Sequence, residues 1–170
     1  MIYYLIAAVV FILDQVSKRY IVKNLTLSES RQVIGEFFQI TSHRNRGAAF
    51  GILEDARWFF LTITVVVVVG LIWYLRKMIR EGKRLLPVAL GLLLGGALGN
   101  FIDRARFGEV VDFLQFRFQF SFFGQPIDYT FAIFNLADSA ISIGVALIVI
   151  DSLLAWRKER RGKSDESYGS

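Results

Sequence analysis

The sequence predicts an all-α integral membrane protein with four transmembrane helices and a small β-structure on its outer face. Three observations support this fold class. Of the 170 residues, 54% are hydrophobic, and the mean hydropathy of +0.46 leaves too few polar residues to coat a water-soluble domain. Residues 58–75 and 85–102 carry no charge, and each stretch is long enough to cross a hydrocarbon core of about 30 Å. Phenylalanines alternate with polar residues over residues 113–123, which is the period of a half-buried strand.

The first predicted helix covers about residues 1–22. It is apolar up to Leu13 and then meets Asp14 and Lys18. A cleaved signal peptide is the alternative interpretation, because the uninterrupted apolar core is short and contains small alanines. The stretch has no basic start, however, and an acid followed four residues later by a lysine favours a retained helix that ends near the membrane interface.

Three further helices complete the predicted bundle. They cover about residues 58–75, 85–103 and 129–155, so that residues 1–156 form a single membrane-embedded domain. The last helix contains Asp138, and its many apolar residues outweigh the cost of inserting one acid. The chain beyond is charged and contains several Ser and Gly residues, so residues 157–170 are expected to be a disordered cytoplasmic tail.

Lysine and arginine residues set the predicted orientation. They crowd into the link at residues 76–84 and into the tail after Trp156, and they are sparser in the long loop before the second helix. Because cytoplasmic loops carry the excess of basic residues, both termini are expected in the cytoplasm, and the loops at about residues 23–57 and 104–128 are expected outside. The net charge of +5 is then explained by the basic residues of the cytoplasmic segments, and no nucleic-acid partner is expected.

Acidic residues within or beside membrane spans are costly, so their default interpretation is functional. Four of them, Asp14, Asp103, Asp112 and Asp138, are predicted at a common depth near the outer leaflet. Asp112 lies in an apolar run, and Asp138 is expected about 9 residues, or roughly 13 Å, inside its helix. Two such carboxyl groups brought together cannot both ionise, so one keeps a proton and the other does not. Such a pair can activate a water molecule for attack on a peptide carbonyl.

Amide side chains accompany these acids. Asn100 precedes Asp103 by three residues, and Asn135 precedes Asp138 by the same spacing, so each pair shares one helix face. Helix capping or a backbone tie is the alternative role for the two asparagines and for Asp14. For Asp103, the alternative is an interfacial ion pair with the arginine that follows it.

Other chemistries are not indicated. The chain has no cysteine and a single histidine, His43, and it lacks a phosphate-binding loop, so no metal or cofactor is expected. An intramembrane proton or ion carrier is the alternative function, but the inner halves of the last three helices offer no polar pathway. A structural subunit is a third interpretation. It would explain Gly91, Gly95 and Gly99, whose spacing favours close helix packing, but not the two unpaired acids.

Five short motifs follow one another along residues 14–139. They read DQVSK at residues 14–18, NRGAAF at 45–50, GGALGNFIDR at 95–104, VVDF at 110–113 and FNLADS at 134–139. Each motif alone is weak. In this order they closely resemble the successive signatures of the bacterial lipoprotein signal peptidase family, signal peptidase II.

The resemblance implies a four-helix aspartic endopeptidase of the bacterial cytoplasmic membrane, which cleaves prolipoproteins just before a cysteine modified with diacylglycerol. The family's catalytic aspartates correspond to Asp112 and Asp138, and the active site is expected near the outer leaflet. The expected partners are a lipid-modified prolipoprotein and membrane lipid, and the protein is expected to be a monomer. The family's small β-structure, the cradle, would correspond to the loop before the second helix together with residues 113–123.

The resemblance also assigns supporting residues. Asn45, Asn100, Asp103, Arg104 and Asn135 match positions that shape or support the site, and Asp14 and Lys18 fall in the first motif. For Asn45, one hypothesis is that its amide holds the substrate or polarises the scissile carbonyl. A tie within its own loop near Gly47 is the other.

Overall fold

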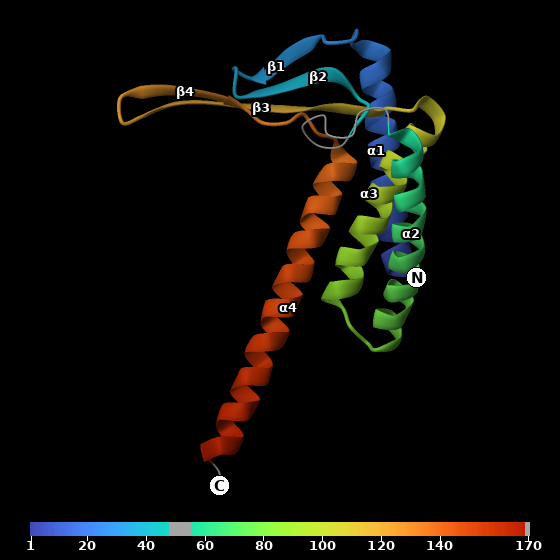
Figure 1. Cartoon of the computed structure of the whole chain (residues 1–170), viewed down its shortest axis with the longest axis vertical. Helices are drawn as coiled ribbons and strands as arrows, with labels where there is room; N and C mark the ends of the chain where they lie inside the picture. Colours follow the sequence, from blue (N-terminus) through green and yellow to red (C-terminus); the bar gives the residue numbers. More distant parts are fainter. Residues whose placement is uncertain (48–55, 169–170) are drawn as a thin grey trace.

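The computed structural model describes residues 1–47 and 56–168, which form a mostly helical molecule with a small sheet at one end of the helices (Figure 1). In chain order the elements are α1 (Ile2–Asn24), β1 (Ser30–Ile34), β2 (Phe38–Asn45), α2 (Arg57–Arg80), α3 (Leu85–Phe107), β3 (Val110–Phe122), β4 (Gln125–Thr130) and α4 (Leu136–Tyr168). Helices α2, α3 and α4 lie on one side of the sheet, whereas the C-terminal part of α1 continues beside it (Figure 1).

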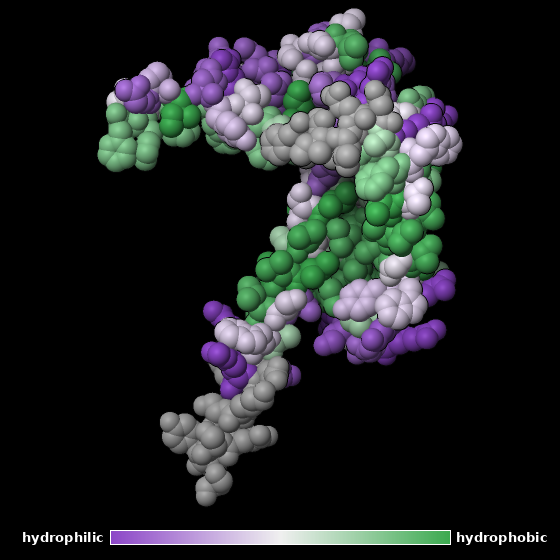
Figure 2. Space-filling view, viewed as in Figure 1, coloured by the Kyte–Doolittle hydropathy of each residue, from purple (hydrophilic) through white to green (hydrophobic). Residues whose placement is uncertain are grey.

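Three of the described helices are long and apolar enough to cross a membrane: α2, α3 and the Leu136–Lys158 part of α4. Figure 2 shows a hydrophobic band over these helices, with hydrophilic side chains beyond it at both ends. Helix α1 is not among the three, because Asp14, Lys18 and Arg19 interrupt its second half. A fourth membrane span therefore stays a prediction.

Helix α3 lies at the centre of the bundle and packs against each of the other three helices. Half of its apolar span is buried, compared with 6% for α2 and 11% for α4. Its glycines make this packing possible, as their spacing predicts. A Cβ on Gly95 would lie 2.5 Å from the carbonyl oxygen of Ala7 in α1, and one on Gly96 would lie 2.5 Å from that of Ala137 in α4.

The sheet is antiparallel with the order β1-β2-β3-β4. Strand β3 confirms the predicted strand at residues 113–123 and pairs with β2 at its start and with β4 towards its end. The outer parts of β3 and β4 therefore form a hairpin that projects beyond the helices (Figure 1). The base of the hairpin is closed where the backbone N–H groups of Phe113 and Leu114 donate to the Phe134 carbonyl at 3.0 and 2.8 Å, and Phe134 N–H donates back to Leu114.

The last helix differs from its prediction at both ends. It begins at Leu136 and not near residue 129, because Gln125–Thr130 pairs with β3 as strand β4. It also continues to Tyr168, through the segment expected to be disordered. Arg, Lys and Glu are good helix formers, and adding residues to an existing helix avoids the cost of a new nucleus. Helices α1, α2 and α3 likewise run a few residues beyond their predicted ends.

Candidate active site

A cleft of about 540 Å³ lies between α3, α4 and the sheet. Phe131, Phe134, Ile141 and Ile143 contribute to its apolar lining. The polar residues that line it are Asn45, Asn100, Arg104, Asp112, Asp138, Ser139 and Ser142. The two acids that the sequence singles out as a pair thus face a single cavity.

Asp112 enters the cleft from the start of β3 and is 2% exposed. The side-chain amide of Asn45 donates to its Oδ2 atom at 3.0 Å, and that of Asn135 donates to its Oδ1 atom at 2.7 Å. Burial, reinforced by the negative charge of Asp138, raises the pKa of Asp112 from 3.8 to about 7. This carboxyl group therefore titrates near the pH of a cell.

Asp138 lies in the first turn of α4 and not some 9 residues inside it, because the helix begins later than predicted. The backbone N–H of Asn135 donates to Asp138 Oδ2 at 3.2 Å, and the Asp138 N–H donates to Asn135 Oδ1 at 2.9 Å. This reciprocal pair caps the helix, as the alternative role for Asn135 predicts. The amide of Asn100 donates to the other oxygen, Asp138 Oδ1, at 2.7 Å.

Asn135 connects the two carboxyl groups. It contacts Asp112 through its side-chain amide and Asp138 through its backbone N–H, and it is itself fully buried. Because a single residue binds both acids, their relative position is set by the start of α4. The approach of two distant chain segments, which the paired-acid hypothesis requires, is present in the structure.

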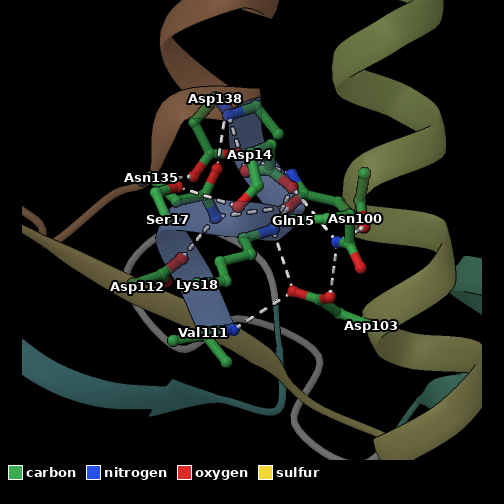
Figure 3. Close-up of polar contacts among 12 residues, drawn as sticks. Asp14, Gln15, Ser17, Lys18, Asn100, Asp103, Val111, Asp112, Asn135 and Asp138 are labelled. Atoms are coloured by element: carbon green, nitrogen blue, oxygen red, sulfur yellow. Dashed lines mark hydrogen bonds and ion pairs between the residues drawn. The ribbon is translucent and has the colours of Figure 1, made fainter. Parts of the chain in front are cut away.

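A second group of polar residues, most of them buried, lies next to Asn100 (Figure 3). We call it the Lys18 cluster, and it consists of Asp14, Gln15, Lys18 and Asp103. Lys18 Nζ lies 2.9 Å from Asp14 Oδ2 and 2.8 Å from Asp103 Oδ2, and all three side chains are at most 4% exposed. Asp103 thus pairs with a lysine on another helix and not with its neighbour in sequence.

The Lys18 cluster joins three helices. Asp14 Oδ1 accepts the backbone N–H of Ala137 at 3.0 Å, so a residue of α1 also caps α4, and the capping alternative for Asp14 holds. Gln15 Nε2 donates to Asp103 Oδ1 on α3 at 2.9 Å. Gln15 was not among the predicted site residues, although a polar side chain between two buried charges in an apolar helix was a signal for it.

Arg104 and Asn45 both bind Gly47, two residues after the end of β2. Arg104 donates to the Gly47 carbonyl at 2.9 Å, and its guanidinium group lies 4.6 Å from the centre of the Phe60 ring. Asn45 Oδ1 accepts the Gly47 N–H at 2.9 Å, so the loop tie predicted for Asn45 is present beside its contact with Asp112. Residues 48–50 of the second motif lie outside the described residues.

The described residues of the cleft offer amides and carboxyl groups for catalysis. Within residues 1–47 and 56–168, no three His, Asp or Glu side chains are grouped so that they could hold a metal ion. The arrangement suits acid–base chemistry on a bond held in the cleft, because one carboxyl group titrates near neutrality beside a second one.

Known proteins resemble this chain over most of its length. A family model described as signal peptidase (SPase) II matches residues 6–154. The lipoprotein signal peptidase of Bacillus pumilus (strain SAFR-032) is 51% identical over 160 residues, which cover 94% of this chain and 97% of the relative.

Two solved structures, both described as a bacterial membrane enzyme determined by the in meso method, share the fold. The one at 2.3 Å resolution has a TM-score of 0.77 at 44% identity and covers 89% of this chain and 87% of its own. The one at 1.9 Å has a TM-score of 0.74 at the same identity, with coverages of 89% and 92%. These matches do not favour an ion carrier. The family match and the 51% identity together show that this chain is a bacterial membrane protease that belongs to the signal peptidase II family.

Proposed function

We propose that this chain removes the signal peptides of prolipoproteins as an aspartic endopeptidase, with Asp112 and Asp138 as its catalytic pair. One observation carries the proposal: both carboxyl groups face one cleft and are bound by the same residue, Asn135. The relative from Bacillus pumilus, which is named a lipoprotein signal peptidase, supports the substrate class.

The chemistry follows from the different environments of the two acids. Asp112, with its raised pKa, keeps the shared proton, and Asp138 acts as the base. Asp138 takes a proton from a water molecule as the water attacks the scissile carbonyl carbon, and Asp112 donates its proton to the carbonyl oxygen. The tetrahedral intermediate then collapses and the C–N bond breaks. The proton on Asp138 passes to the leaving amine, and one hydroxyl group of the intermediate returns a proton to Asp112 as the carboxylic acid product forms. Asn45, Asn100 and Asn135 hold the two carboxyl groups in place through this cycle.

The proposed substrate is a prolipoprotein cleaved before a diacylglyceryl-modified cysteine. Its acyl chains hold that cysteine at the outer leaflet, so the membrane supplies much of the positioning. The apolar wall formed by Phe131, Ile141 and Ile143 suits an apolar signal peptide.

We further propose that the site lies near the outer leaflet of the cytoplasmic membrane, with α1 as a fourth span. Residues 1–156 then form the membrane-embedded domain, and residues 157–170 belong to a cytoplasmic tail. The basic residues at 76–84 and after Trp156 support an orientation with both termini in the cytoplasm and the sheet outside. The protein would act as a monomer, without a metal, cofactor or nucleic acid.

The hairpin of β3 and β4 supports this placement, because its two faces differ. Phe118 pairs with Tyr129 and Phe120 with Ile127, whereas Gln119 pairs with Asp128, so aromatic side chains share one face and polar ones the other. Figure 2 shows the hydrophobic face directed towards the side on which the helices lie. Aromatic residues favour the interface between lipid and water, so this face would rest on the outer leaflet.

The test is cleavage of a lipid-modified prolipoprotein by Asp112→Asn and Asp138→Asn, each made separately and reconstituted in lipid. Each variant should insert and purify folded but cleave roughly 10²- to 10⁴-fold more slowly than the wild type. Asp128→Asn, an exposed acid on β4, is the matched control and should cleave normally. Normal cleavage by Asp112→Asn or Asp138→Asn would remove that residue from the pair.

A further inference from the structure

Lys18 uses every donor of its ammonium group inside the protein. Its side chain is 3% exposed, and Nζ contacts Asp14 Oδ2 at 2.9 Å, Asp103 Oδ2 at 2.8 Å and Asn100 Oδ1 at 2.9 Å. An ammonium group has three N–H donors and no acceptor. The first two contacts balance charge, but the third binds a neutral amide, and charge balance does not explain it.

The contact with Asn100 determines which way that side chain points. Because only an oxygen can face an ammonium group, Asn100 Oδ1 must lie towards Lys18 and Nδ2 must lie away from it. In this orientation Nδ2 donates to Asp138 Oδ1 at 2.7 Å. The reversed amide would place its NH₂ group against the ammonium and its oxygen against the carboxylate, so both contacts would become repulsive.

Asn135 supports the same orientation more weakly. Its side-chain amide donates to Asn100 Oδ1 at 3.2 Å while also donating to Asp112 at 2.7 Å. The bond from Lys18 is shorter and comes from a charged donor, and such bonds are roughly twice as strong as neutral ones. Lys18 is therefore the dominant determinant of how Asn100 is placed.

We propose that Lys18 is a positioning residue for peptide cleavage, whose ammonium group holds the Asn100 amide in the orientation that donates to Asp138. The inference rests on the proposed function, because Asp138 has to be a reacting group. Lys18 reaches Asp138 through Asn100, and its charge also acts on Asp112 at longer range. It is not among the residues that line the cleft, so it does not touch substrate there. It should therefore affect the chemical step and not substrate binding.

The experiment measures kcat and KM for Lys18→Met, Asn100→Ala and the combined variant on a lipid-modified prolipoprotein peptide. Methionine keeps most of the length of lysine but removes the charge and the donors. Lys18→Met should lower kcat by about 10- to 100-fold, the effect of losing a hydrogen bond to a charged group, with KM nearly unchanged. Adding Lys18→Met to Asn100→Ala should cause much less loss than Lys18→Met causes alone, because the main effect of Lys18 passes through Asn100. Losses that multiply in the combined variant, or a change confined to KM, would overturn the proposal.

A second variant guards against misfolding, because Lys18→Met leaves Asp14 and Asp103 without their counter-charge. Lys18→Met combined with Asp103→Asn removes one charge of each sign and keeps the net charge of the cluster. This variant should purify folded, with a lowered thermal midpoint because Asp14 stays buried without its counter-charge, and it should still show the lowered kcat. A folded protein with wild-type kcat would reject the positioning role.

The same experiment separates the inference from the proposed function. If the wild type fails to cleave, or if Asp138→Asn cleaves normally, the proposed function is wrong. If both of those behave as expected and Lys18→Met keeps its kcat, only the role of Lys18 is wrong.

Discussion

Two ionic clusters in this protein have nearly the same geometry and opposite surroundings. In the Lys18 cluster, Lys18, Asp14 and Asp103 pair at 2.8 to 2.9 Å, and their side chains are at most 4% exposed. On the sheet, Arg117 pairs with Glu36 at 2.9 Å and with Asp128, and these side chains are 35 to 52% exposed. Distance alone does not distinguish the two clusters.

Their surroundings decide what each cluster does. A charge buried without its partner is costly, so the Lys18 cluster restricts how α1, α3 and α4 can pack. Water screens exposed charges and replaces a lost partner, so the pairs around Arg117 contribute little to stability. The comparison teaches that the structural role of an ion pair here depends on whether water can reach it.

The largest effect is expected from Asp14→Ala. The substitution removes one of the two carboxylates that contact Lys18 Nζ and leaves the Ala137 N–H without its acceptor. The free energy of unfolding should fall by on the order of 3 kcal/mol, measured by chemical unfolding in detergent micelles. A loss below about 1 kcal/mol, the size expected of an exposed pair, would remove the contrast between the two clusters.

Gly99→Ala should also disturb the Lys18 cluster, though less. A Cβ there would lie 2.5 Å from Asp14 Oδ2, so the carboxylate or the helix would have to move. The expected loss is about 1 to 3 kcal/mol in the same unfolding assay. Gly70→Ala on α2 is the control, because its Cβ would meet no atom within 4 Å, and it should be neutral or stabilising. Equal losses at the two glycines would argue against close packing as the cause.

The same contrast between buried and exposed groups should appear in the pH dependence of stability, where buried Asp112 can be compared with exposed Asp128. Asp112 binds its proton more tightly when folded, because burial raises its pKa to about 7, so the free energy of unfolding should fall as pH rises from about 4 to about 7. The thermal midpoint of the wild type relative to Asp112→Asn should therefore drop between pH 5 and pH 8.

Asp128 should behave in the opposite way. A hydrogen bond from Arg117 lowers the pKa of Asp128, so its contribution is present above about pH 4 and is lost as the pH falls further. Between pH 5 and pH 8, the thermal midpoint of Asp128→Asn should thus change by the same amount as that of the wild type. A pH-dependent difference in that window would mean that water does not reach this acid.

The smallest effect is expected from Arg117→Gln. It breaks the pairs with Glu36 and Asp128, but all of these groups stay in contact with water. The thermal midpoint and the rate of prolipoprotein cleavage should both equal those of the wild type within error. A clear drop in cleavage rate would show that ion pairs on the sheet also position the site.

The sequence indicated which two acids meet at the cleft better than it indicated their structural setting. Asp112 could be selected because a carboxylate in an apolar run has few structural explanations. The predicted depth of Asp138 within its helix was wrong. Residues 129–134 are as apolar as a membrane helix, and only the pairing of this part of the chain with β3 shows that the helix starts later. Hydropathy carries no information about such pairing.

The partners of Lys18 show the same limit. Helical spacing predicts its contact with Asp14, four residues earlier. Its contacts with Asn100 and Asp103 depend on how α1 is rotated against α3, and this rotation results from packing at Gly91 and Gly95. No local pattern in either helix specifies that rotation.

The closed base of the hairpin has a practical consequence. Leu114 and Phe134 are hydrogen-bonded to each other just beyond the two aspartates, so the strands outside this point act as a spacer. The turn at Phe123 and Gly124, with φ values of +49° and +75°, lies at the far end of that spacer. A tag or a fluorescent reporter could be grafted there, and the arm itself could be shortened by matched pairs of residues, without altering the separation of Asp112 and Asp138.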